Sequence, residues 1–117
     1  MFIIYDLAFV LFALVALPFY LLRGKLHRGF LARLGFLPKI GNLNSPIWIH
    51  AVSVGEVFAM RRIIEGLRLA YPGKKFVFST VTPTGNKIAQ SLARDDDLVT
   101  FLPFDVSFIT RRVISRI

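Results

Sequence analysis

The sequence predicts an α/β protein in which an N-terminal transmembrane helix precedes an incomplete Rossmann-like parallel βαβαβ unit. Apolar residues make up 55% of the 117 residues and are most concentrated in the first 22 positions. After position 45, short apolar runs alternate with segments whose apolar residues recur every three or four positions, a pattern that favours strands, helices and right-handed crossovers. We therefore expect a transmembrane anchor over 1–22, a basic juxtamembrane linker over 23–45 and a partial domain over 46–117.

The anchor is expected over Phe2–Leu22, which contains a single acid, Asp6. A helix of about 20 apolar residues is long enough to cross a bilayer. Basic residues follow this run, whereas a signal peptide carries them before a shorter run, so we expect a retained single-pass anchor. The positive-inside bias then places the remaining chain in the cytoplasm. A buried core helix is the alternative, but Pro18 and the nearly complete lack of a polar face disfavour it.

The linker alternates basic residues with Leu and Phe, a pattern typical of segments that lie on a membrane surface. These basic residues either meet anionic head groups or a phosphorylated lipid substrate, or serve only to orient the anchor. The net charge of +8 favours anionic partners, but no nucleic-acid recognition motif accompanies it, so we expect no nucleic acid as partner. The residues expected to face lipid are Arg23, Lys25, Arg28 and Arg33.

Three strands and three helices are expected beyond the linker. Because three strands bury only a marginal core and the last helix lacks a partner, we expect the chain to be part of a longer protein. Cys is absent, which excludes disulfides, a thiolate nucleophile and Cys-based zinc sites. The expected elements are strand 47–52, a helix that ends at Pro72-Gly73, strand 76–81, a helix from Thr82-Pro83 to the acidic turn 95–97, strand 98–102 and helix 107–117.

A Ser-x-Gly-Glu turn, Ser53 to Glu56, leads from the first predicted strand into the first predicted helix. Ligands of open α/β sheets bind outside the carboxyl ends of strands, where N–H groups of the next helix are free. The turn fits a capping box, with Ser53 as N-cap and Glu56 bonding back to the Ser53 N–H. It also fits a site in which Gly55 lets a substrate approach and Glu56 accepts a proton from a sugar hydroxyl. Both interpretations stay open.

Further candidates follow the second and third predicted strands. Thr82, Thr84 and Gly85 could offer hydroxyls and N–H groups to an anion at the second helix N-terminus, or simply cap that helix. Asp105 follows the third strand at the same expected edge, where it either lines a cleft or caps the last helix.

Other polar residues are expected to be structural. Trp48 and His50 alternate with apolar residues on the first strand, so we expect packed or hydrogen-bonded core residues. The polar side of the first helix is expected to be solvated, with an i, i+4 ion pair between Arg61 and Glu65. That side also carries Arg62 and Arg68.

Several motifs in this order resemble one family. A single N-terminal anchor, a basic linker, WIHAVSVGE, a strand that runs into TPTG, and LPFD are together similar to the N-terminal part of 3-deoxy-D-manno-octulosonic acid (Kdo) transferases. WIHAVSVGE is fairly specific to that family, and the other two motifs count only in sequence with it. The resemblance covers nearly the whole chain.

The resemblance implies the N-terminal, acceptor-side half of a glycosyltransferase-B type fold. It implies an inverting, metal-independent enzyme without a cofactor that moves Kdo from CMP-Kdo to a lipid A precursor at the cytoplasmic face of the bacterial inner membrane. Glu56 would be the general base, and CMP-Kdo would bind mainly in a C-terminal domain outside this chain, without which the chain would be inactive. The alternative is a non-enzymatic, membrane-anchored α/β module that binds anionic lipid or a partner protein.

Overall fold

The computed structural model describes residues 2–23, 29–38 and 43–117, and the chain divides into two compact units. The sheet unit comprises Leu37–Leu102 with Ile117, and the N-terminal unit comprises Met1–Phe36 with Pro103–Arg116. The segment after the third strand therefore belongs to the same unit as the N-terminal helix. The expected division into an anchor over 1–22, a linker over 23–45 and a partial domain over 46–117 stays a prediction.

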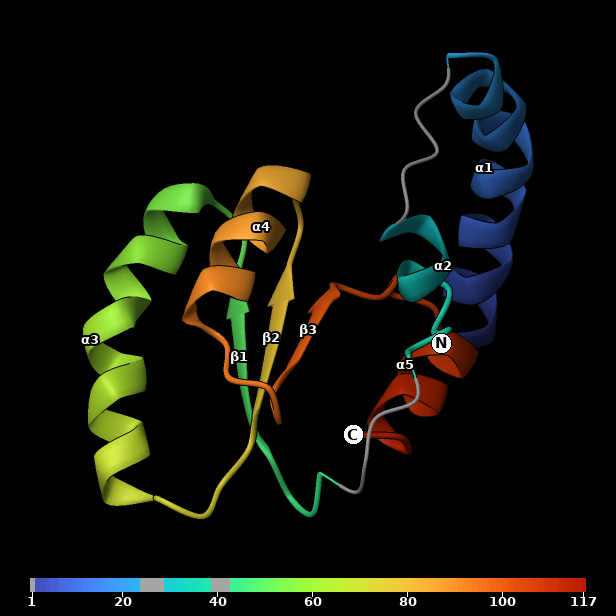
Figure 1. Cartoon of the computed structure of the whole chain (residues 1–117). Helices are drawn as coiled ribbons and strands as arrows, with labels where there is room; N and C mark the ends of the chain where they lie inside the picture. Colours follow the sequence, from blue (N-terminus) through green and yellow to red (C-terminus); the bar gives the residue numbers. More distant parts are fainter. Residues whose placement is uncertain (1, 24–28, 39–42) are drawn as a thin grey trace. The chain divides into compact units, whose positions relative to one another are not determined.

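The sheet unit contains a three-stranded parallel sheet in the order β1-β2-β3 (Figure 1). Ile47 pairs with Phe76 at one end of the sheet, and Ala51 pairs with Thr80 at the other. The predicted βαβαβ order and parallel pairing are confirmed, although each strand is one residue shorter than expected. Its elements are β1 (Ile47–Ala51), α3 (Val54–Ala70), β2 (Phe76–Thr80), α4 (Pro83–Leu92) and β3 (Leu98–Phe101).

Helices α3 and α4 cover the same face of the sheet (Figure 1). Successive right-handed crossovers that advance in one direction across a sheet place their helices on one face. Both helices turn their periodic apolar residues toward that face. The core that results contains Ala51, Val57, Ile64, Phe76, Phe78 and Ala89. Both helix N-termini consequently lie at the carboxyl edge of the sheet.

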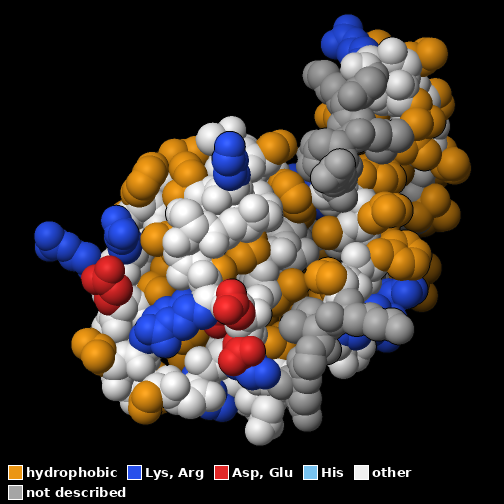
Figure 2. All heavy atoms as spheres, in the orientation of Figure 1, with side chains coloured by type: hydrophobic (Ala, Val, Ile, Leu, Met, Phe, Trp, Pro, Cys, Tyr) orange, Lys and Arg blue, Asp and Glu red, His pale blue; other side chains and the backbone are white. Residues whose placement is uncertain are grey.

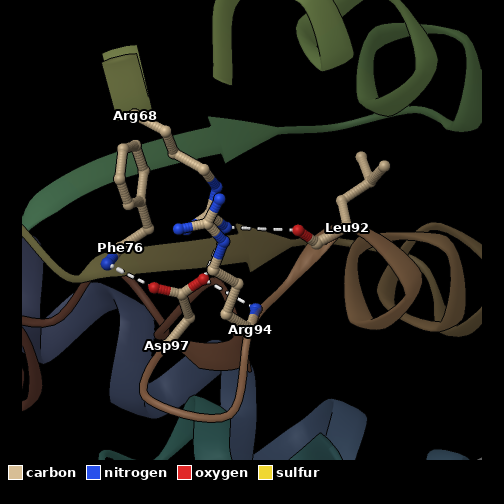
Figure 3. A network of polar contacts seen from close by, with 5 residues as sticks. All are labelled: Arg68, Phe76, Leu92, Arg94 and Asp97. Carbon is tan, nitrogen blue, oxygen red and sulfur yellow. Dashed lines mark hydrogen bonds and ion pairs between the residues drawn. The ribbon is translucent and has the colours of Figure 1, made fainter. Parts of the chain in front are cut away.

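A buried polar network at the other end of the strands corrects one expectation from the sequence. Arg68, expected on the solvated side of α3, instead forms an ion pair of 2.6 Å with Asp97, and their side chains are only 10% and 2% exposed (Figure 3). Asp97 also accepts the backbone N–H groups of Phe76 and Arg94 at 2.8 Å, while Arg68 donates to the Leu92 carbonyl. The network ties α3 to β2 and to the turn before β3. In contrast, the predicted ion pair between Arg61 and Glu65 is confirmed. Both side chains are exposed, and Arg61 Nε lies 3.8 Å from Glu65 Oε1.

The N-terminal unit contains α1 (Phe2–Leu22), α2 (Gly29–Arg33) and α5 (Ser107–Ile114). Helix α2 was not expected in the linker. Beyond its end at Arg33, Gly35 has a φ of +84°, which suits glycine, and the Phe36 N–H donates to the Leu31 carbonyl at 3.1 Å. Helix α5 contributes Val113, which is almost fully buried. Helix α5 was predicted over 107–117, but it ends at Ile114.

Helix α1 is the one helix among the described residues that is long and apolar enough to cross a membrane. It is apolar on nearly all sides, and Figure 2 shows hydrophobic side chains along its length. Pro18 lies within it, and no residue of it is fully buried. These features agree with the expected membrane anchor.

Candidate active site at the carboxyl end of strand β1

Glu56 is positioned by a capping arrangement at the start of α3. Ser53 has extended backbone geometry and accepts the Glu56 N–H at 3.3 Å, as an N-cap does. The Ser53 hydroxyl donates to one carboxylate oxygen of Glu56 at 3.2 Å, and the Val52 N–H donates to the other at 2.9 Å. The predicted capping interpretation is therefore confirmed, with Val52 making the returned backbone bond that was expected from Ser53.

These bonds hold the Glu56 carboxylate in its charged form. The pKa of Glu56 is lowered from 4.5, chiefly because the Val52 N–H donates to its carboxylate. Desolvation is the next largest effect and opposes this, while the Ser53 hydroxyl and backbone and nearby His50 each lower the pKa further by smaller amounts. The side chain is nonetheless exposed. Capping and catalysis are thus compatible here, because an exposed, ionised carboxylate at a sheet edge can still accept a proton. The lowered pKa reduces its basicity in the free protein.

Space is open beside Gly55, as a substrate site would require. A Cβ atom added at Gly55 would meet only the Ser53 hydroxyl, at 4.0 Å. No packing within the described part of the chain therefore demands glycine at this position. This leaves the approach of a ligand to the first turn of α3 as one physical reason for a glycine here.

His50 and Trp48 lie on β1 next to this turn, and both bond to Ser79 on β2. Trp48 Nε1 donates to the Ser79 hydroxyl at 2.8 Å, and His50 Nδ1 lies 3.0 Å from the Ser79 carbonyl oxygen. Both side chains are exposed, so the prediction of hydrogen bonding is confirmed and that of core burial is wrong. The alternation along the strand predicted a structural role for His50, whereas its place near the end of that strand puts it next to the Glu56 turn.

The start of α4 lies at the same edge of the sheet. Thr82 is the N-cap and accepts the Gly85 N–H at 3.1 Å. Gly85 is buried, and an added Cβ would approach the Thr82 hydroxyl to 3.0 Å, so Gly85 has a packing role and its N–H is occupied. Thr84 is exposed. These contacts favour the interpretation that Thr82 and Gly85 cap and pack the start of α4. Nearby, at the end of β2, the Thr80 hydroxyl is buried without a hydrogen-bond partner among the described residues.

Asp105 lies in the N-terminal unit rather than in the sheet unit. It accepts a hydrogen bond of 3.2 Å from the Tyr5 hydroxyl. It does not cap α5, whose N-cap, Val106, makes no side-chain bond, so that alternative was wrong. A role in substrate binding for Asp105 remains a prediction.

Two of the four predicted lipid-facing residues are described. Arg23 is exposed and stacks over the Phe19 ring at 4.2 Å. Arg33 is half-buried, 5.9 Å from the Phe104 ring centre, and burial lowers its pKa. Only Arg23 therefore has the expected exposure. Lys25 and Arg28 lie outside the described residues.

A metal-binding group was not expected. In the part of the chain that the structure describes, no cluster of three or more His, Asp or Glu side chains could hold a metal ion. Catalysis without a metal or cofactor stays a prediction.

Comparison with known proteins identifies one family. Residues 28–117 match the family described as 3-deoxy-D-manno-octulosonic-acid transferase (kdotransferase). The chain is 37% identical to the 3-deoxy-D-manno-octulosonic acid transferase of Haemophilus influenzae over 79 aligned residues. This alignment covers 64% of the chain. The chain is 28% and 31% identical to those of Chlamydia pneumoniae and Chlamydophila psittaci, in each case over 97% of this chain. No solved structure matches.

The chain spans only 18% of the Haemophilus relative and 27% and 28% of the two chlamydial relatives. The matched region includes the complete sheet unit and with it the Glu56 turn.

Proposed function

Because the chain belongs to the 3-deoxy-D-manno-octulosonic-acid transferase family, we propose that it is the N-terminal, acceptor-side part of a membrane-associated glycosyltransferase of lipopolysaccharide biosynthesis. Its sheet unit would belong to the first Rossmann-like domain of a glycosyltransferase-B type fold. The donor would be CMP-Kdo and the acceptor a lipid A precursor at the cytoplasmic face of the bacterial inner membrane. Most donor contacts would come from a C-terminal domain, and this chain alone would be inactive.

The observation that carries the proposal is the exposed, ionised carboxylate of Glu56 at the carboxyl end of β1. In the proposed reaction, Glu56 takes the proton from a glucosamine hydroxyl of the acceptor as that oxygen attacks the anomeric carbon of Kdo. The bond from that carbon to the phosphate of CMP breaks, and CMP departs with the electron pair. Open space at Gly55 would admit the acceptor, and Ser53 would keep the carboxylate oriented.

The roles of the remaining predicted residues follow from their positions. Thr82 and Thr84 at the start of α4 are proposed to border the acceptor site, with Gly85 supporting the turn by packing. Arg23 is proposed to meet anionic head groups.

A chimeric enzyme tests the proposal. Residues 28–117 of this chain replace the matching segment of the Haemophilus influenzae relative, and Kdo transfer from CMP-Kdo to a lipid A precursor is measured in membranes that lack other transferase activity. We expect transfer within about tenfold of the parent, since a tenfold difference is only about 1.4 kcal/mol of activation free energy.

A folded, membrane-bound chimera with no transfer would contradict the proposal. The alternative, a non-enzymatic module, would then be favoured if this chain bound acidic vesicles in a salt-sensitive way.

A further inference from the structure

His50 presents an imidazole ring at the edge of the sheet where Glu56 lies. Ala51 is buried in the core that α3 and α4 cover, so Trp48 and His50 lie on the opposite face of β1. The Glu56 carboxylate accepts the Val52 N–H, and Val52 follows His50 at a distance of about 7 Å along an extended chain. All these residues belong to the sheet unit. His50 and Glu56 are therefore neighbours at the carboxyl end of β1.

A buried residue of β2 holds the His50 ring from one side. Nδ1 of His50 lies 2.9 Å from the Ser79 hydroxyl oxygen and 3.0 Å from the Ser79 carbonyl oxygen. Ser79 is only 1% exposed, and its hydroxyl also accepts the Trp48 Nε1–H at 2.8 Å. Because the ring is already oriented by this anchor, a ligand that binds its other nitrogen immobilises little further side chain.

The other ring nitrogen, Nε2, is available to a ligand. Within the part of the chain that the structure describes, no residue bonds to Nε2, and the His50 side chain is exposed. A ring nitrogen of imidazole donates or accepts according to the tautomer, whereas a hydroxyl does both. A hydroxyl is therefore a suitable partner for Nε2 in either tautomer.

The charge of Glu56 also favours an uncharged ligand group beside His50. The pKa of the Glu56 carboxyl is lowered, chiefly because the Val52 N–H donates to it, so the carboxylate is ionised at neutral pH. An anionic group next to that carboxylate would be repelled, and a hydroxyl would not.

Trp48 adds an aromatic surface on the same face of β1. Its side chain is 37% exposed, and its bond to Ser79 fixes the indole next to His50. Ligand sites combine aromatic side chains with a few well-placed polar groups. A sugar suits this combination, because its ring has apolar C–H faces and carries several hydroxyls.

We propose that His50 is a substrate-binding residue, which bonds through Nε2 to a sugar hydroxyl of the acceptor beside the hydroxyl that Glu56 deprotonates. The Trp48 ring packs against the same sugar. His50 takes no part in the proton transfer. This inference rests on the proposed function for the identity of the acceptor, and it gives a binding role to a residue that the sequence predicted to be structural.

Fluorescence of Trp48 measures binding directly, because it is the only Trp among the 117 residues. The full chain, solubilised in detergent, is titrated with a deacylated lipid A precursor and, separately, with the dephosphorylated form of that ligand. We expect a saturable change in emission with both ligands. Absence of a saturable change in the unsubstituted chain would overturn the inference.

Two substitutions separate a ligand contact from a structural role. His50→Asn places an amide nitrogen near the position of Nδ1 and keeps a bond to Ser79, but it has no group at the position of Nε2. His50→Gln places its amide near the position of Nε2 and gives up the bond to Ser79. We expect His50→Asn to raise Kd at least about fivefold, as for the loss of one hydrogen bond, and His50→Gln to raise it less.

A greater loss of affinity in His50→Gln than in His50→Asn, or unchanged affinity in His50→Asn, would overturn the inference. Circular dichroism confirms that both variants are folded. The phosphorylated and dephosphorylated ligands should lose affinity by the same factor, and a loss confined to the phosphorylated ligand would contradict the assignment of a hydroxyl. These measurements require no Kdo transfer. A chimera without transfer, together with binding that depends on Nε2 of His50, would therefore contradict the proposed function alone.

Discussion

At the scale of single residues, Glu56 combines a structural and a proposed chemical role. Its carboxylate accepts bonds from the Val52 N–H and the Ser53 hydroxyl, so its orientation is fixed before any substrate arrives. The same bonds lower its pKa, whereas a general base works best with a pKa near the working pH.

Replacement of Ser53 by Ala tests this coupling. The change removes the hydroxyl that donates to Glu56, so the pKa of Glu56 should rise toward 4.5, and loss of the N-cap should cost about 1 kcal/mol of stability. The pKa is measured by carbon-detected NMR titration. Ser91→Ala, an exposed change within α4, should leave that pKa unaltered. An unchanged pKa in Ser53→Ala would contradict the account.

The sign of the pH dependence follows from the lowered pKa. A carboxyl with a lower pKa in the folded state than in the unfolded state stabilises the fold above the unfolded value, and this contribution is lost as the pH falls through the folded value. The start of α3 should therefore be destabilised by acid below pH 4.5, and neutral pH should leave it intact.

At the scale of elements, the sheet unit depends on the buried Arg68–Asp97 pair. Four bonds converge on these two side chains, and the Arg68 guanidinium also stacks 4.6 Å from the Phe76 ring centre. Removal of one member of a buried pair leaves an uncompensated charge. The pair lies at the amino ends of the strands, away from Glu56, so it supports the fold rather than the proposed chemistry.

Asp97→Asn should lower the free energy of unfolding by about 3 to 5 kcal/mol, because Arg68 is left buried without its counter-charge. Urea unfolding of the detergent-solubilised protein, followed by circular dichroism, measures the change. Glu65→Gln is the matched control, since its pair with Arg61 is exposed and should contribute at most about 0.5 kcal/mol. Equal losses in the two variants would show that the network contributes little.

The sequence predicted the strands and helices of the sheet unit because their periodicities and turn residues are local signals. Thr82-Pro83 at the start of α4 is one such case, and the structure confirms it. Arg68 was misjudged because its partner, Asp97, lies 29 residues away in a turn that carries no periodicity. The place of His50 beside Glu56 was missed because alternation along a strand tells which residues share a face but not what covers that face.

At the scale of the whole molecule, sequence patterns predicted least about contacts between segments that lie far apart in the chain. The apolar run of α1 predicted a membrane anchor, but its contacts with Asp105 and Ser107 join positions about 100 residues apart and leave no trace in the pattern of either segment. The family, in contrast, was recognisable from motifs, because WIHAVSVGE keeps the cap, the open glycine and the acid in one short run.

The most direct test of the central claim is Kdo transfer by the chimeric enzyme carrying Glu56→Gln. The amide oxygen can still accept the Val52 N–H, so the fold should persist while the proton acceptor is lost. The account predicts a fall in kcat of at least about 100-fold, within the range for loss of a general base, and unchanged transfer for the exposed control Glu65→Gln. Near-normal turnover by a folded Glu56→Gln enzyme would contradict the assignment of Glu56 as the base.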